Sequence, residues 1–141
     1  MIRDAVIGDF NDELLELIDE AYAETPFTGL KYNRPHVQRW FANACTFKER
    51  FFCRVVEEEG RIVGLLIGFI SDTVWGLPTS QTLVSYSRSG TDRLIRQFVQ
   101  WSKEKKAAQV TVMTVPGKEK YEELVSKLGF FESGNAYTKE I

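Results

Sequence analysis

Apolar side chains recur at helical spacing in four stretches of the chain. In one of them Val37, Trp40 and Phe41 stand at positions i, i+3 and i+4, which places them on one face of a helix. Asn33-Arg34-Pro35 opens this helix, with the proline where a missing N–H costs nothing. The four apolar stripes predict helices around residues 14–22, 37–44, 94–102 and 121–128.

Between these helices lie short β-branched and apolar segments that are typical of strands. Residues 51–57 and 62–70 are joined by Glu58-Glu59-Gly60-Arg61, a pattern typical of a hairpin. The second of these strands is nearly all apolar, as expected of a strand covered on both faces. Strands are predicted at residues 2–7, 51–57, 62–70, 82–86, 109–115, 130–133 and 136–141, the last two as a hairpin around Gly134-Asn135.

Length and composition predict one globular domain over residues 1–141, since the chain is 43% hydrophobic and 27% charged. Its 18 basic and 20 acidic residues give a net charge of -2 without a basic stripe, which argues against nucleic-acid binding. The longest apolar run, residues 62–70, is far shorter than the roughly 20 residues of a membrane-spanning helix. Because residues 1–4 hold no apolar signal segment, we expect a cytoplasmic protein without membrane partners.

The chain has two cysteines and one histidine that could serve as soft metal ligands. Cys45 and Cys53 stand in apolar contexts, and without an export signal they are expected to be buried thiols in preference to a disulfide. No CxxC or HxxxH spacing is present, so we expect no metal site.

Four motifs resemble the GNAT superfamily of acyl-CoA-dependent N-acyltransferases. Residues 58–64 (EEGRIVG) are similar to the family's hairpin before its third strand, and residues 124–130 (LVSKLGF) to its "LYxKLGF" motif. Residues 83–95 hold the strand, loop and helix where the family binds pyrophosphate, and residues 94–101 resemble the short, phage-type members. The order of predicted elements agrees with the family along the whole chain.

The resemblance implies an α+β, single-domain GNAT fold, with a mixed central sheet of about seven strands flanked by four helices. It also implies acetyl-CoA as the acyl donor. Successive backbone N–H groups at a helix N-terminus form an anion site for the coenzyme pyrophosphate, and the preceding strand would polarise the acetyl carbonyl through a backbone N–H. The candidate coenzyme-binding residues are Val84, Ser85, Arg88, Ser89, Gly90, Thr91 and Arg93.

The chain departs from the family pattern at the residues that carry chemistry. Asp92 stands where the pattern has Gly or Ala, and Val125 stands where the family has its tyrosine acid. Tyr121, one helical turn earlier on the same face, is the candidate general acid, although an aromatic residue on an apolar stripe is also typical of a core. Asp72 is the only carboxylate between Ser71 and Gly90 and therefore the candidate general base, with a solvated strand end as the alternative.

Two functions remain open at this stage. The first is an N-acetyltransferase that moves the acetyl group from acetyl-CoA directly to a primary amine on a small molecule or a protein. The second is a catalytically inactive GNAT-fold binding or assembly protein, for example a phage-encoded one. The resemblance alone does not separate them, because fold does not fix function. Phe51-Phe52 and the aromatic residues of the second helix leave room for a homodimer.

Overall fold

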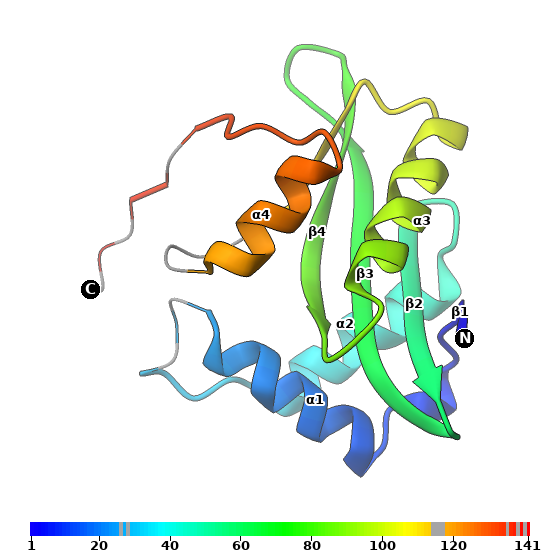
Figure 1. Cartoon of the computed structure of the whole chain (residues 1–141). Helices are drawn as coiled ribbons and strands as arrows, with labels where there is room; N and C mark the ends of the chain where they lie inside the picture. The colour runs from blue at the N-terminus through cyan, green and yellow to red at the C-terminus, as the bar shows by residue number, and fades with distance from the viewer. Residues whose placement is uncertain (26, 28, 114–117, 135, 138, 140) are drawn as a thin grey trace.

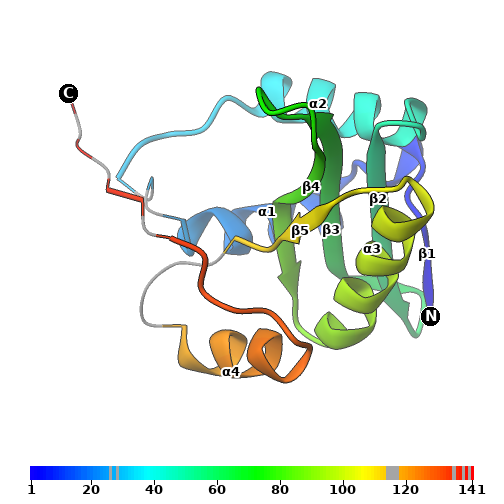
Figure 2. The same cartoon turned by 90° about the horizontal axis from the view of Figure 1, so that it is seen from above.

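The computed structural model describes residues 1–25, 27, 29–113, 118–134, 136, 137, 139 and 141. A central sheet lies between two layers of helices, as the view from above shows (Figure 1, Figure 2). Helices α1 (Asp12–Ala23) and α2 (Arg34–Thr46) cover one face, and α3 (Thr91–Glu104) and α4 (Glu119–Lys127) cover the other. The four predicted helices are thereby confirmed, and a short 3-10 helix, η1 (Ile7–Asp9), precedes them.

Side-chain caps define where the first two long helices begin. The Asn11 side chain accepts a hydrogen bond from the backbone N–H of Leu14 at 3.1 Å, and Asn33 accepts one from His36 at 3.0 Å. These caps satisfy N–H groups that a helix start otherwise leaves without an acceptor. The residue before α3 is Gly90, which has no side chain that could cap the helix.

The sheet has five strands in the order β1-β2-β3-β4-β5, with antiparallel pairing throughout except between β4 and β5, which are parallel. The strands are β1 (Ile2–Asp4), β2 (Phe51–Glu58), β3 (Arg61–Asp72), β4 (Pro78–Ser87) and β5 (Gln109–Thr111). Strand β4 is longer than predicted because Pro78 and Thr79, expected in a loop, pair with β3.

The expectation of about seven strands is wrong at the C-terminal end. Residues 130–134 form no strand, and Phe131 is 82% exposed. A strand needs a neighbouring edge to pair with, and β5 ends at Thr111, so its short edge receives no further strand among the described residues. The turn predicted at Asn135, and part of the final strand, lie outside the described residues.

Apolar side chains fill both gaps between the sheet and the helices. Phe41 of α2 is buried on one face, and Phe98 of α3 on the other. Gly68 of β3 lets Phe98 approach, because a Cβ atom on this glycine would lie 2.3 Å from the Phe98 ring. Phe52 is also buried and packs against Phe98, so this residue is not available for the dimer face suggested by the sequence.

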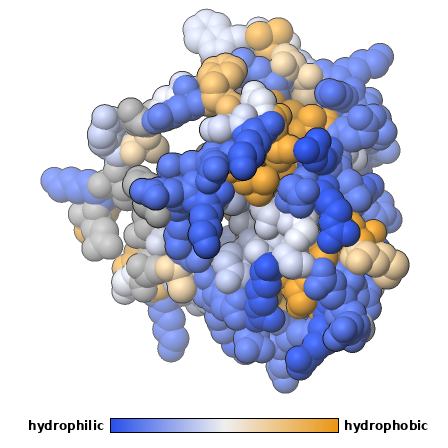
Figure 3. Space-filling view, in the orientation of Figure 1, coloured by the Kyte–Doolittle hydropathy of each residue, from blue (hydrophilic) through white to orange (hydrophobic). Residues whose placement is uncertain are grey.

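The outer surface of α3 and α4 is mostly hydrophilic, with apolar surface showing between the two helices (Figure 3). Three large apolar residues at the tip of the β3–β4 hairpin, Val74, Trp75 and Leu77, are exposed. Within the described part of the chain, no helix combines the length and apolarity needed to cross a bilayer.

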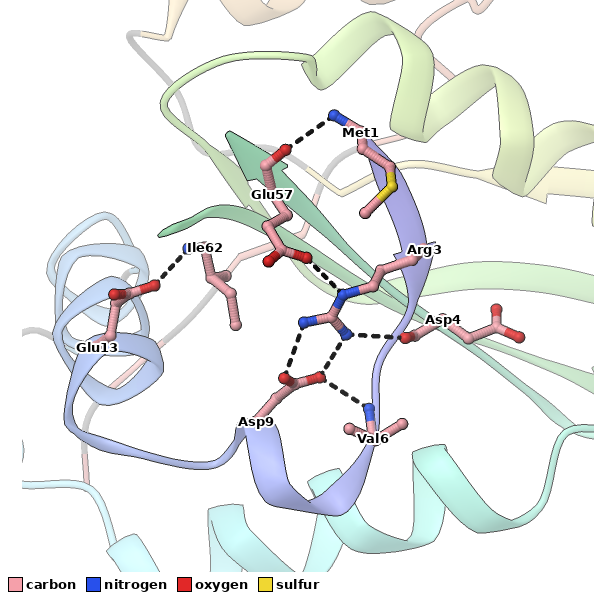
Figure 4. A network of polar contacts seen from close by, with 8 residues as sticks. All are labelled: Met1, Arg3, Asp4, Val6, Asp9, Glu13, Glu57 and Ile62. Atoms are coloured by element: carbon pink, nitrogen blue, oxygen red, sulfur yellow. Dashed lines mark hydrogen bonds and ion pairs between the residues drawn. The ribbon is translucent and has the colours of Figure 1, made fainter. Parts of the chain in front are cut away.

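A polar network ties the first strand to the sheet (Figure 4). The Arg3 guanidinium donates two hydrogen bonds to the Asp9 carboxylate at 2.8 and 3.0 Å, and a third to Glu57 at 2.7 Å. Asp9 also accepts from the backbone N–H of Val6 at 2.8 Å. These donors stabilise the charged carboxylate and hold the pKa of Asp9 below its usual value, with Arg3 the largest cause.

Candidate functional site

Strands β4 and β5 separate part of the way along the sheet. They pair only between Thr79–Gln81 and Gln109–Thr111, and β4 then continues to Ser87 beside β3 alone. The Thr82 hydroxyl accepts a hydrogen bond from the Met113 backbone N–H at 3.0 Å, so a side chain takes the place of the next main-chain pairing. From Thr82 onward, one backbone edge of β4 therefore faces an opening in the sheet, as far as the described residues show.

A β-bulge lies at the point where this opening begins. Ile67 pairs with Val84 and Gly68 pairs with Thr82, so Leu83 is an extra residue in β4. A bulge leaves one residue out of the ladder and turns the local backbone groups away from the neighbouring strand. Val84 follows the bulge, and its partly buried side chain packs against the apolar cluster between the sheet and helices α1 and α2. This is the segment that the sequence assigns to orienting the acetyl carbonyl.

The structure brings two of the predicted site residues together across this opening. The hydroxyl groups of Ser85 on β4 and Tyr121 on α4 lie 3.4 Å apart. Burial raises the pKa of Tyr121 above its usual value, and the Ser85 hydroxyl opposes this only in part. The phenol therefore keeps its proton at neutral pH and can act as a donor toward the open half of β4.

The loop after β4 ends in a left-handed glycine that starts α3. Gly90 has a φ of +77°, and a Cβ atom there would lie 3.0 Å from Arg93 and 3.3 Å from Val56. No side chain caps the helix, so the backbone N–H groups of Thr91 and the next two residues have no capping acceptor. An anion can accept from these groups, and the small size of Gly90 permits close approach.

The basic residues of this loop are already paired with carboxylates of the chain. Arg88 donates to Glu20 of α1 through its Nε at 3.1 Å and through a second nitrogen. The nearest guanidinium nitrogen of Arg93 lies 4.0 Å from Glu58, and the Ser89 hydroxyl donates to the same carboxylate at 2.5 Å. A phosphate bound here would have to compete with Glu20 and Glu58 for these cations.

The second predicted catalytic residue lies elsewhere. Asp72 is exposed and pairs with Pro78 at the tip of the β3–β4 hairpin. At about 3.3 Å per residue along a strand, Asp72 is on the order of 20 Å from Ser85. The structure therefore does not bring Asp72 and Tyr121 to one point, and a role for Asp72 as a base stays a prediction.

Carboxylates of α1 lie closer to the open half of β4 and were missed in the sequence. Glu20 accepts from the Tyr86 hydroxyl at 2.9 Å, and Glu24 pairs with Lys118, just before α4, at 3.1 Å. The signal for them is the spacing of Glu16, Glu20 and Glu24, which are four residues apart and so share one helical face. Helices α1 and α4 lie on opposite faces of the sheet (Figure 2).

Among residues 1–113 and 118–141, apart from the few positions that the structure leaves undescribed, no three His, Cys, Asp or Glu side chains gather to hold an ion.

Comparison with known proteins supports the fold and leaves the activity open. No protein-family model and no curated protein sequence matches the chain. Three solved structures illustrate the match. Glucosamine-6-phosphate N-acetyltransferase from Arabidopsis thaliana aligns at a TM-score of 0.72 and 17% identity over 99% of this chain and 97% of that one. A GNAT family acetyltransferase from Staphylococcus aureus aligns at 0.68 and 17% identity over 100% and 98%. A transcriptional regulator from Bacillus halodurans aligns at 0.74 and 19% identity over 100% and 99%.

The chain has the GNAT fold that the sequence motifs predict. Identities of this size show the fold alone. The transcriptional regulator among these structures illustrates why activity has to be argued from the site.

Proposed function

We propose that the protein is an N-acetyltransferase that moves the acetyl group of acetyl-CoA to a primary amine by direct transfer. The observation that carries this proposal is the Tyr121 hydroxyl beside Ser85 at the open half of β4, with the Gly90 turn at the end of the same strand. Pantetheine amides would pair with the free backbone edge of β4, and the pyrophosphate would accept from the first N–H groups of α3.

The backbone after the bulge would orient and polarise the thioester. In this proposal the acetyl carbonyl accepts a hydrogen bond from the Val84 or Ser85 backbone N–H as it gains negative charge. The amine lone pair attacks the carbonyl carbon, and the tetrahedral intermediate then breaks its carbon–sulfur bond. Tyr121 gives its proton to the departing thiolate, because its phenol is held in the neutral form.

The attacking amine has to reach the site without its extra proton. A free amine of ordinary pKa, about 10.4 for a lysine side chain, is mostly protonated at neutral pH. The Glu16, Glu20 and Glu24 face of α1 would attract such a cation, and a water molecule would accept the proton that the amine loses. That the acceptor is a primary amine and that the protein is cytoplasmic are parts of this proposal that rest on the sequence alone.

A second candidate function is binding without catalysis, and it too rests on a specific observation. Arg88 and Arg93 face Glu20 and Glu58, and Asp92 adds a third carboxylate to the loop. A loop whose cations are neutralised internally has a weaker field for a pyrophosphate. A GNAT-fold protein that has lost coenzyme binding would show such pairing.

Calorimetric titration with acetyl-CoA separates the two candidates. Binding in the micromolar range, with the coenzyme fragment 3′,5′-ADP binding more weakly at the same loop, supports the acetyltransferase. Ligand at one hundred times its dissociation constant adds about 2.7 kcal/mol of stability, which a melting curve detects as an independent readout. Neither heat nor a melting shift at millimolar coenzyme would overturn the proposal and favour the second candidate.

A further inference from the structure

Two thiols meet between α2 and β2, away from the opening beside β4. Cys45 lies in the last turn of α2 and is half-buried, whereas Cys53 lies on β2 and is buried. Both are free thiols, they belong to the same apolar cluster between the sheet and α2, and they line the same cavity.

A cavity borders both cysteines. It has a volume of about 250 Å³ and lies where β1 leaves β2, just past the hydrogen bond from Ala5 N–H to the Cys53 carbonyl. Three basic and three acidic side chains also line it, namely Lys48, Arg54, Lys105, Asp4, Glu49 and Glu104. Hydrogen peroxide is little larger than a water molecule, which occupies about 30 Å³ in the liquid, so the cavity has room for this oxidant.

The surroundings make the two sulfur atoms chemically unequal. The Cys53 hydrogen bond, the largest cause, lowers the pKa of Cys45, and Lys48 acts in the same direction against burial, Asp4 and Asp9. The same hydrogen bond and burial raise the pKa of Cys53. Cys45 is half-buried whereas Cys53 is buried, so Cys45 is the thiol that an incoming oxidant reaches first.

We propose that Cys45 and Cys53 form a redox-active dithiol that hydroperoxides convert to a disulfide joining α2 to β2. The Cys45 thiolate attacks the peroxide, its O–O bond breaks, and Cys45 becomes a sulfenic acid while hydroxide or alkoxide leaves. The Cys53 thiol then attacks the Cys45 sulfur, the S–O bond breaks, and water leaves as the disulfide forms. Two thiols are oxidised and one peroxide is reduced, so atoms and electrons balance.

The test treats the purified, reduced full chain with hydrogen peroxide and blocks remaining thiols with N-ethylmaleimide. The intact mass should fall by about 2 Da, the two hydrogen atoms lost to a disulfide, and neither cysteine should take up the reagent. Trypsin cuts after Lys48 and Arg50, so the disulfide should link peptide 40–48 to peptide 51–54. Dithiothreitol should restore both free thiols.

Single-cysteine variants assign the two roles. Cys53→Ser should accumulate a dimedone-reactive sulfenic acid at Cys45, whereas Cys45→Ser should show much slower oxidation of its remaining buried thiol. Wild-type protein that keeps both thiols, or forms only links between chains, at a peroxide concentration that oxidises Cys45 in Cys53→Ser would overturn the proposal. If Cys53→Ser does not fold, the wild-type peptide map decides alone. None of these readouts depends on acetyl-CoA.

Discussion

The Tyr121 hydroxyl lies 3.4 Å from the Ser85 hydroxyl, which joins α4 to the half of β4 that, among the described residues, pairs with β3 alone. Tyr121 is thereby the one predicted catalytic residue that the fold brings to the opening. Its buried ring and its polar tip have separable roles, because removal of the hydroxyl alone keeps most of the packing.

Tyr121→Phe should lower kcat by about 10²-fold or more if the phenol gives a proton to the thiolate, the usual size of a general-acid effect. The dissociation constant of acetyl-CoA should stay the same, because the ring remains in place. Initial rates and calorimetry on the same preparation measure both quantities. Tyr137→Phe is the control, since Tyr137 is 93% exposed and outside the site. An unchanged kcat would remove Tyr121 from the mechanism.

Gly90→Glu should abolish binding of acetyl-CoA, because it places a carboxylate and a side chain at the proposed pyrophosphate site. The left-handed backbone at this position costs about 1–2 kcal/mol with any L side chain, so stability also falls. Gly76→Glu is the matched control, since Gly76 has a φ of +73° with open space around it at the far hairpin. Equal coenzyme affinity in the two variants would show that the loop assignment is wrong.

Glu20→Gln should strengthen coenzyme binding by releasing Arg88 from its ion pair. The gain should be at most about fivefold, because an exposed pair is worth about 1 kcal/mol or less. Calorimetric titration measures it, with Glu16→Gln on the same helix face as the control. Weaker binding in Glu20→Gln would instead mean that Glu20 holds Arg88 in its working position.

Asp9→Asn should destabilise the protein at pH 7 by roughly 1–3 kcal/mol, because Arg3 would keep only Glu57 as a charged partner in a partly buried network. Asp9 has a lower pKa in the fold than in the unfolded chain, where it is about 3.9. The stabilisation from its charge is therefore complete above that value and disappears as the pH falls through the lower, folded-state pKa. In urea unfolding, the difference in free energy of unfolding between wild type and Asp9→Asn should become smaller from pH 7 to pH 3.

The control for this pH effect is Asp12→Asn, an exposed carboxylate in the first turn of α1. It should cost less than about 1 kcal/mol, the usual size of a helix-dipole contribution. If the difference in free energy of unfolding between wild type and Asp9→Asn stayed constant with pH, the loss of the charge would not be the cause of the destabilisation.

Gly68→Ala should destabilise the fold by about 1–3 kcal/mol, as overpacked cores do. Its new methyl group would lie 2.3 Å from the Phe98 ring, which is fully buried and has no space to move into. Gly8→Ala, with nothing within 4 Å, is the matched control. Equal urea midpoints for the two variants would contradict the packing between β3 and α3.

The sequence predicts the helices better than the strands, and the reason is physical. The apolar stripe of α3 and the proline that opens α2 are local signals, so the helices follow from spacing and start residues alone. A strand exists only beside a partner, and nothing near Phe130 in the sequence reveals that β5 ends too early to offer one. The fold itself came from motif resemblance, which periodicity by itself could not supply.

The candidate site likewise has some features with a local signal in the sequence and others that depend on long-range packing. Gly90 is recognisable in the sequence as a glycine before a helix, and the structure gives it a positive φ. The pairing of Arg88 with Glu20, 68 residues away, has no local signal and depends on how α1 packs on the sheet. Asp72 was chosen as the only carboxylate in its segment, but strand register places it at the opposite end of β4 from Ser85.

The divergence of β4 from β5 also bears on how the protein avoids association. From Thr82 to Ser87, β4 presents an edge without a strand neighbour among the described residues, and exposed edges recruit strands of other chains. The extra residue of the bulge, Leu83, is apolar and 40% exposed, so it offers no charge that would oppose pairing with another strand. Helix α4 shields this edge of β4. The α4 residues that pack against the core are only partly buried. Loss of α4 packing would therefore expose this edge of β4 to pairing with strands of other chains.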